Sequence, residues 1–124
     1  MISAIRRTLD IDALRQIFDD LTPADFQHWE RVLEQMRLAC LNKDLQAIAE
    51  MDIAFHHYLL VCAKEPDLLV IWEMLAGRIQ SHFLQTQQQC PSVMEIYEEH
   101  HALLEAFRTK SLTEAVRLLK KSIH

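Results

Sequence analysis

Apolar residues in this 124-residue chain recur every three or four positions over most of its length, which is the spacing of amphipathic helices. No segment alternates apolar and polar residues as a strand does. The pattern predicts helices over about 9–20, 23–41, 43–64, 66–88, 92–108 and 112–124. We therefore expect an all-α fold. Because short loops place successive helices side by side, we expect the helices to form an antiparallel bundle, a single domain over residues 1–124.

Capping residues mark the starts of several predicted helices. Thr22 precedes Pro23, which predicts an N-cap followed by proline at the first helical position. Two Ser-x-x-Glu segments match the capping box, in which the serine and glutamate side chains bind otherwise unpaired backbone amides. These segments are Ser92 to Glu95 and Ser111 to Glu114, and Asn42 is a candidate cap for the third helix.

Composition narrows the class of partner. The net charge of −5 makes the chain a poor candidate for binding nucleic acid or an anionic membrane. Cys40, Cys62 and Cys90 are widely spaced without a CxxC motif, which argues against a disulfide framework and fits a reducing compartment. The amino terminus lacks the apolar core of a signal peptide, and the longest apolar run, 58–63, is too short to span a bilayer. We therefore expect a cytoplasmic protein that does not bind membranes.

Two predicted helices carry polar residues where a hydrophobic core needs apolar ones. In the third helix, Asp52 and His56 lie one turn apart in the middle of the apolar stripe. In the fifth helix, His100 lies at the centre of the stripe, whereas the adjacent His101 falls at its edge. Periodicity therefore predicts that Asp52, His56 and His100 point into the bundle.

Two interpretations account for these inward polar groups. A buried carboxylate is unfavourable by several kcal/mol unless it is paired, so an aspartate–histidine hydrogen bond inside the bundle is one solution. The other is a divalent metal ion such as Zn²⁺, Ni²⁺ or Mn²⁺, since one carboxylate oxygen and two neutral imidazoles on facing helices are suitable ligands. Because the D-x-x-x-H spacing is common by chance, the pattern leaves both interpretations open.

Three further polar residues lie on or beside apolar stripes. His82 falls within the stripe of the fourth helix, Arg78 lies at its margin one turn earlier, and Ser122 continues the stripe of the last helix. For the fourth helix, the simpler interpretation is a core histidine with a polar neighbour and an arginine whose head reaches water. The functional interpretation is a polar wall for a pocket that holds an anion.

Three segments together carry a family resemblance. They are Asp52-Ile-Ala-Phe-His56 with Leu59 and Ala63-Lys-Glu-Pro66-Asp-Leu68-Leu69, then Glu99-His100-His101-Ala-Leu-Leu-Glu-Ala106, and finally Thr113-Glu-Ala115 through Ile123. They resemble the D-x-x-F-H…N-P-x-L, E-H-x-x-[IL]-L-x-A and A-x-x-A-x-x-x-H-[IL] motifs of the FCD domain, the effector-binding half of FadR-type regulators in the GntR family. The match covers roughly residues 22–123 in the right order. Leu118 and Ser122 replace the second alanine and the histidine of the closing motif, and Glu65 replaces the asparagine before the proline.

The resemblance implies a bundle of six or seven helices that holds a metal beside a pocket for a small carboxylate metabolite. By position, Asp52, His56 and His100 match the first three metal ligands of the family. The closing histidine falls at Ser122, a weak ligand. The resemblance therefore implies three protein ligands completed by water or effector, or a metal-free bundle like that of the acyl-CoA-binding members. It also implies a homodimer that contacts DNA only through an N-terminal winged helix-turn-helix domain, which we expect to be absent from this chain.

Two other classes of function compete with an effector sensor. A di-iron enzyme needs two Glu-x-x-His motifs and two more inward glutamates, but the one matching pair starts at Glu98, on the polar side of its helix. We therefore expect no enzyme. A structural adaptor would carry the same polar cluster without a pocket. The sequence favours the effector-sensing and dimerisation domain of a GntR-type transcriptional regulator.

Overall fold

The computed structural model describes residues 2–87 and 92–123, and over those ranges every regular element is a helix. The elements are α1 (Ile2–Ile17), the short 3-10 helix η1 (Phe18–Asp20), α2 (Pro23–Leu41), α3 (Leu45–Ala63), α4 (Pro66–Gln87), α5 (Met94–Arg108) and α6 (Leu112–Ser122). The predicted all-α fold is confirmed. None of these helices is long and apolar enough to cross a membrane.

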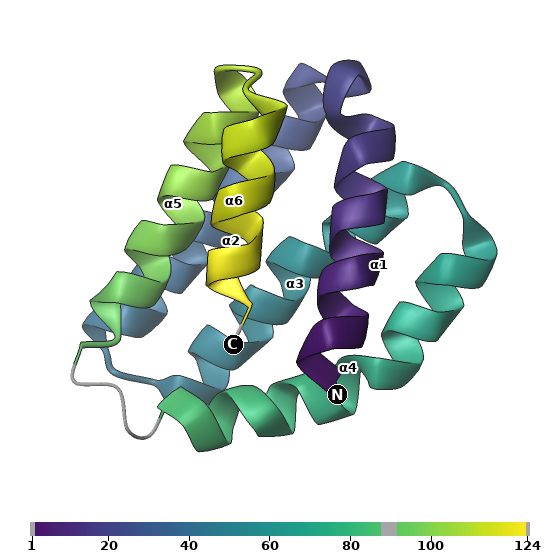
Figure 1. Cartoon of the computed structure of the whole chain (residues 1–124). Coiled ribbons are helices and arrows are strands. Elements are labelled where there is room, and N and C mark those ends of the chain that lie inside the picture. Colours follow the sequence, from purple (N-terminus) through teal and green to yellow (C-terminus); the bar gives the residue numbers. More distant parts are fainter. Residues whose placement is uncertain (1, 88–91, 124) are drawn as a thin grey trace.

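The central helix of the bundle is α3. It packs against α1, α2 and α4, while α5 packs against α2 and α6, and α1 packs against α6. Figure 1 shows α6 between α5 and α1, with α4 crossing the lower edge of the bundle. This arrangement lets side chains from α1, α3 and α5 meet in one interior.

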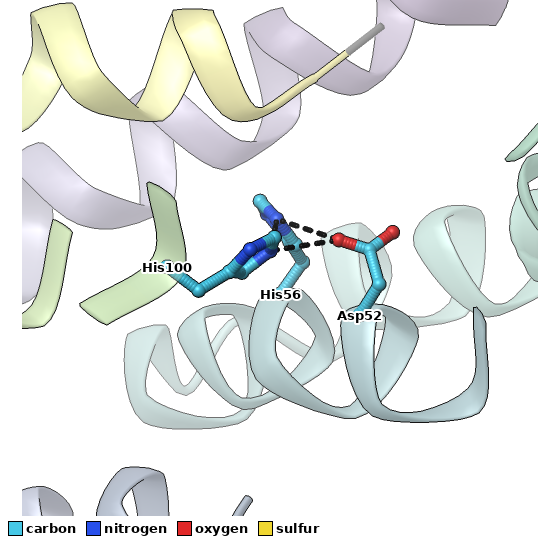
Figure 2. A group of neighbouring side chains, drawn as sticks. All are labelled: Asp52, His56 and His100. Carbon is cyan, nitrogen blue, oxygen red and sulfur yellow. Dashed lines mark hydrogen bonds and ion pairs between the residues drawn. The ribbon is translucent and has the colours of Figure 1, made fainter. Parts of the chain in front are cut away.

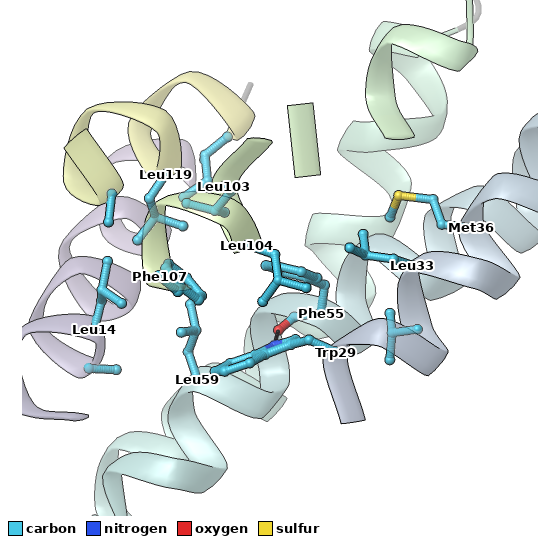
Figure 3. Packing of buried hydrophobic residues seen from close by; sticks show 14 of the residues in the cluster. Leu14, Trp29, Leu33, Met36, Phe55, Leu59, Leu103, Leu104, Phe107 and Leu119 are labelled. Carbon is cyan, nitrogen blue, oxygen red and sulfur yellow. Dashed lines mark hydrogen bonds between the residues drawn. The ribbon is translucent and has the colours of Figure 1, made fainter. Parts of the chain in front are cut away.

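Leucine and aromatic side chains fill much of that interior (Figure 3). Trp29 of α2, Phe55 of α3 and Phe107 of α5 are buried, and the Trp29 and Phe107 ring centroids lie 5.2 Å apart. The Trp29 Nε1–H group donates a hydrogen bond of 3.0 Å to the carbonyl oxygen of Phe55. Because a buried indole needs both apolar neighbours and an acceptor, this contact fixes how α2 packs on α3.

The first helix begins at Ile2 rather than near residue 9, so the predicted start is wrong. Its buried face contains Arg6 and Asp10 as well as Ala13, Leu14 and Ile17. A search for apolar stripes misses the first turns because charged residues occupy the inward positions there.

Two of the predicted helix starts are confirmed. Thr22 caps α2 and forms a capping box with Asp25, whose side chain accepts from the Thr22 amide while the Asp25 amide donates to the Thr22 hydroxyl. Ser111 caps α6 by accepting from the Glu114 amide at 3.4 Å. The Glu114 carboxylate pairs with Arg117 instead of completing the box.

Two other predicted starts are wrong. Asn42 ends α2, and Asp44 caps α3 by accepting from the Ala47 amide. The fifth helix begins at Met94 with Val93 at its N-cap position, one residue later than an N-cap at Ser92 predicts. In both cases a residue of the right type lies a residue or two from the helix start that the chain adopts.

Candidate metal centre

Asp52 and His56 lie one turn apart on α3 and face His100 of α5 (Figure 2). All three are buried, with exposed fractions of 1%, 0% and 1%. His100 Nε2 lies 2.8 Å from Asp52 Oδ1, and His56 Nε2 lies 3.3 Å from His100 Nε2 and 3.4 Å from the same aspartate oxygen. The structure thus brings together the three residues that the sequence analysis singles out as metal ligands.

In each histidine ring, the Nδ1 atom lies within hydrogen-bond distance of an acceptor behind the ring. His100 Nδ1 lies 2.7 Å from the carbonyl oxygen of Ile96, which can only accept, so this nitrogen carries a hydrogen. His56 Nδ1 lies 2.8 Å from Oδ2 of Asp10 and donates to that carboxylate. Both inner Nε2 atoms therefore present lone pairs when the rings are neutral. Histidine ligands of metals are usually oriented in this way, by a carboxylate or a carbonyl behind the ring.

Three acceptor atoms then converge in the interior. Lone pairs separated by 2.8 to 3.4 Å repel one another unless a positive charge lies between them. That charge is either a second proton on one ring or a metal ion. Metal–ligand bonds of about 2.1 Å place neighbouring ligand atoms roughly 3.0 to 3.4 Å apart in octahedral or tetrahedral sites. The donor types and their spacing fit a divalent ion.

Two charged residues of α1, which the apolar periodicity does not predict to be buried, complete the cluster. Arg6 Nη2 lies 3.2 Å from Asp52 Oδ2, and both side chains are buried. Asp10 holds His56, and its other oxygen accepts a 2.8 Å hydrogen bond from Trp72 Nε1 of α4. A detectable signal exists, since residues 6, 10, 13 and 17 follow helical spacing, so an extended first helix puts Arg6 and Asp10 on the buried face.

These contacts set the protonation of Asp52 and His56. Burial alone would raise the pKa of Asp52, but the Arg6 guanidinium, together with the close contacts that His100 and His56 make with this carboxylate, holds the pKa well below its ordinary value. Burial and the Arg6 charge would lower the pKa of His56, yet hydrogen bonds to Asp10 and Asp52 outweigh them, and the pKa is raised. Asp52 is therefore anionic at neutral pH, and a metal ion bound at this cluster would displace a proton from it.

The cluster keeps an excess of negative charge when both carboxylates are ionised and both rings are neutral. Arg6 offsets one of the two charges of Asp10 and Asp52, and its Nε has no hydrogen-bond partner among the described residues. A buried, uncompensated charge is strongly unfavourable. One additional cation in the interior would remove that penalty.

A small pocket adjoins Asp52. Its lining residues are Ile2, Ser3, Arg6, Asp52, Ile79, His82, Phe83 and Ser122. Its volume of about 10 Å³ is close to the least that one water molecule occupies. Ser122 is buried there, and its hydroxyl donates to the carbonyl oxygen of Leu119 at 2.8 Å. Arg78 is exposed and does not line the pocket, whereas the half-buried His82 does.

The class of protein to which this helical bundle belongs follows from its family. The model of the FCD domain family matches residues 1–124, and the chain belongs to that family, the effector-binding domains of GntR-type transcriptional regulators. It is a regulatory domain and not an enzyme.

The structure of E. coli McbR/YncC has the same fold. It matches with a TM-score of 0.85 at 23% sequence identity, over 98% of this chain and 58% of that one. This chain therefore spans a little over half the length of that protein. A comparison with curated proteins gives no match.

Proposed function

We propose that this chain is the effector-sensing and dimerisation domain of a GntR-type regulator, and that it binds a small carboxylate beside a divalent metal ion. The observation that carries the proposal is the convergence of one carboxylate oxygen of Asp52 with the Nε2 atoms of two imidazole rings. Asp10 and the Ile96 carbonyl orient these rings from behind. DNA binding would belong to a separate domain of the complete regulator.

Asp52 Oδ1, His56 Nε2 and His100 Nε2 would hold the metal. When bound, the ion supplies a fixed positive charge to which a carboxylate oxygen of an effector can coordinate. Ser122 lies in the pocket beside Asp52, and its hydroxyl is already committed to Leu119. Three protein ligands leave coordination positions for water or effector, in the manner of an open rather than a closed zinc site.

Arg6 supplies a second group that can recognise a carboxylate. Arg6 lines the pocket, and its guanidinium Nε lacks a hydrogen-bond partner among the described residues. A guanidinium binds a carboxylate with paired, charge-assisted hydrogen bonds. Because the pocket has room for about one water molecule, a larger effector must move its lining, of which Ile2 and Ser3 belong to the first turn of α1. Effector binding would thereby reposition the start of α1, and that movement is the signal we propose for a DNA-binding domain joined before it.

One observation favours a metal-free alternative. Arg6 already forms a buried ion pair with Asp52, and one extra proton on His56 would satisfy the remaining acceptors. The cluster would then be a polar core, and the domain a structural adaptor or a sensor of the acyl-CoA type. The pocket volume of about 10 Å³ does not accommodate an acyl chain without a large rearrangement.

Metal analysis separates these alternatives. Protein purified without metal-affinity capture is analysed by elemental mass spectrometry, before and after incubation with Zn²⁺, Ni²⁺ or Mn²⁺. We expect about one equivalent in the parent and in His101→Ala, an exposed neighbour, and little in Asp52→Ala and His100→Ala. Circular dichroism verifies that each variant folds, and Asp52→Asn is the milder replacement. No metal in the folded parent after incubation would overturn the metal site.

Thermal shift measurements test the effector. The metal-loaded protein is screened with mono-, di- and tricarboxylates, sugar acids and acyl-CoAs, since a ligand of the native state raises Tm. We expect carboxylates to raise the Tm of the parent and Arg6→Lys to retain part of the shift that Arg6→Met loses, because lysine keeps the charge without the paired donors. Stabilisation by acyl-CoA alone, without metal, would favour the alternative.

A further inference from the structure

The outer face of α4 carries large apolar side chains that none of the described helices covers. Val70, Ile71 and Met74 are 53%, 44% and 76% exposed, while Trp72 and Ile79 on the opposite side are buried. The helix contacts α3 and α1, and Figure 1 shows it along the edge of the bundle with its other side free. An apolar face of this kind is typical of a protein–protein contact.

The exposed residues form a regular seam. Asp67, Ile71, Met74 and Arg78 follow one another at intervals of four, three and four residues, which is the spacing of contact positions in paired helices. All four are exposed. Asp67 and Arg78 form no ion pair with any residue that the structure describes. The seam therefore has an apolar centre, an acidic end and a basic end.

The charges at the two ends determine which partner complements the seam. A second copy of α4 placed antiparallel brings Asp67 of each chain opposite Arg78 of the other, and Ile71 of each opposite Met74 of the other. A parallel placement would oppose like charges. The antiparallel arrangement is the self-complementary contact that a two-fold dimer requires, in which the same patch serves both subunits.

Gly77 is consistent with a close neighbour on this face. Glycine inside a helix is unfavourable by about 1 kcal/mol relative to alanine. A Cβ added at Gly77 would meet nothing within 4 Å, so no contact inside the chain requires a glycine there. Gly77 lies one turn after Met74 and one residue before Arg78, where a bare backbone leaves room for the side chains of a second helix.

We infer that two copies of this chain dimerise through an antiparallel pairing of their α4 helices, centred between Ile71 and Met74. This inference identifies the surface through which the dimerisation in the proposed function would occur. It rests on the dimerisation part of that proposal and not on the metal site. The metal ligands lie on α3 and α5, so the two can be tested separately.

Sedimentation velocity over a range of concentrations tests the surface. We expect the parent to dimerise and Met74→Glu to raise the dissociation constant by about tenfold or more, because a charge replaces the central apolar contact. The matched control is Leu41→Glu, which changes a 57% exposed leucine at the end of α2 and should leave the dimer intact. A parent dimer that Met74→Glu leaves unchanged overturns the α4 interface.

Charge reversal tests the antiparallel order. Asp67→Lys places a lysine opposite Arg78 of the other chain, and Arg78→Glu places a glutamate opposite Asp67, so each variant alone should dimerise more weakly. When the two variants are mixed, each end pair of a heterodimer joins opposite charges, and we expect heterodimers to form in preference to either homodimer. Equal weakening in the mixture would overturn this pairing.

Metal content distinguishes the two proposals. It should be unchanged in Met74→Glu, because the substitution lies on α4 and the metal ligands lie on α3 and α5. A parent that remains monomeric at every concentration would overturn the interface and the dimerisation part of the proposed function together, whatever its metal content.

Discussion

The imidazole of His56 in α3 donates its Nδ1 hydrogen to Oδ2 of Asp10 in α1, over 2.8 Å and across 46 residues of sequence. This hydrogen bond selects the tautomer in which Nε2 presents its lone pair to Asp52 and His100. The aspartate is itself fixed by Trp72 of α4, whose indole nitrogen donates to Oδ1 at 2.8 Å. Three helices thus determine the direction of one lone pair, which is how residues behind a ligand tune a metal site.

Asp10→Asn should weaken zinc binding by about 10- to 100-fold, the usual effect of losing such an orienting group. An amide that accepts from Trp72 presents its NH₂ group to His56, which favours the tautomer with the hydrogen on Nε2. A competition titration against a chromophoric chelator measures the affinity. Asp12→Asn, an exposed change on the same helix, is the control. Unchanged affinity in folded Asp10→Asn would show that the tautomer does not depend on this contact.

Ser122→His should tighten zinc binding by about tenfold or more, because an imidazole replaces a hydroxyl that is a poor ligand for a divalent ion. Ser122 is buried and lines the pocket beside Asp52. The same titration applies, and Ser122→Ala should leave the affinity close to that of the parent. Equal affinities in the histidine and alanine variants would place residue 122 beyond coordination distance.

Cys62 should react slowly with iodoacetamide. Burial and the negative charge of Asp25 raise the pKa of this thiol to about 11. Since only the thiolate reacts, about one thiol in a thousand is reactive at pH 8, and alkylation should be about two orders of magnitude slower than for an unstructured cysteine. The rate should rise about tenfold per pH unit between pH 8 and 10. Peptide mapping by mass spectrometry follows the site.

Two controls accompany the Cys62 measurement. Asp25→Asn removes the nearby charge and should accelerate alkylation, because the thiol pKa falls toward its ordinary value. Alkylation of Cys62 in urea should proceed at the rate of a free cysteine. A fast reaction in the native protein at pH 8 would contradict the raised pKa.

Gly77→Ala should raise the free energy of unfolding by about 0.5 to 1 kcal/mol, since alanine favours the helix and its methyl group meets nothing within 4 Å. Urea denaturation of both proteins in the Met74→Glu background keeps the proposed α4 interface out of the comparison. The reverse change at an exposed position of α5, Ala102→Gly, should lower stability by a similar amount. A loss of stability in Gly77→Ala would reveal a steric contact at that position.

The order and type of the helices could be predicted from local information. Periodicity gives α2 and α4 almost to the residue, because their apolar stripes are continuous and Thr22 and Pro66 mark their starts. It also turns Asp52, His56 and His100 inward, since each occupies a position that the stripe of its own helix defines. The family resemblance, confirmed over the whole chain, rests on the same positions.

The partners of these residues depend on the tertiary structure. Arg6 and Asp10 are of residue types that usually lie at the surface. They are buried here because they form an ion pair and a hydrogen bond with Asp52 and His56, in a helix 46 residues further along the chain. A buried charge is tolerated only where a partner offsets it, and no local pattern identifies that partner.

The two polar residues of α4 also separate what local spacing predicts from what only the tertiary structure decides. Periodicity places His82 within one stripe and Arg78 at its margin, and only packing puts His82 in the pocket wall and Arg78 on the exposed seam. Local spacing establishes which face of a helix turns inward where the apolar stripe is continuous. The folded bundle decides which charges meet there, because that depends on distances between helices that no local spacing encodes.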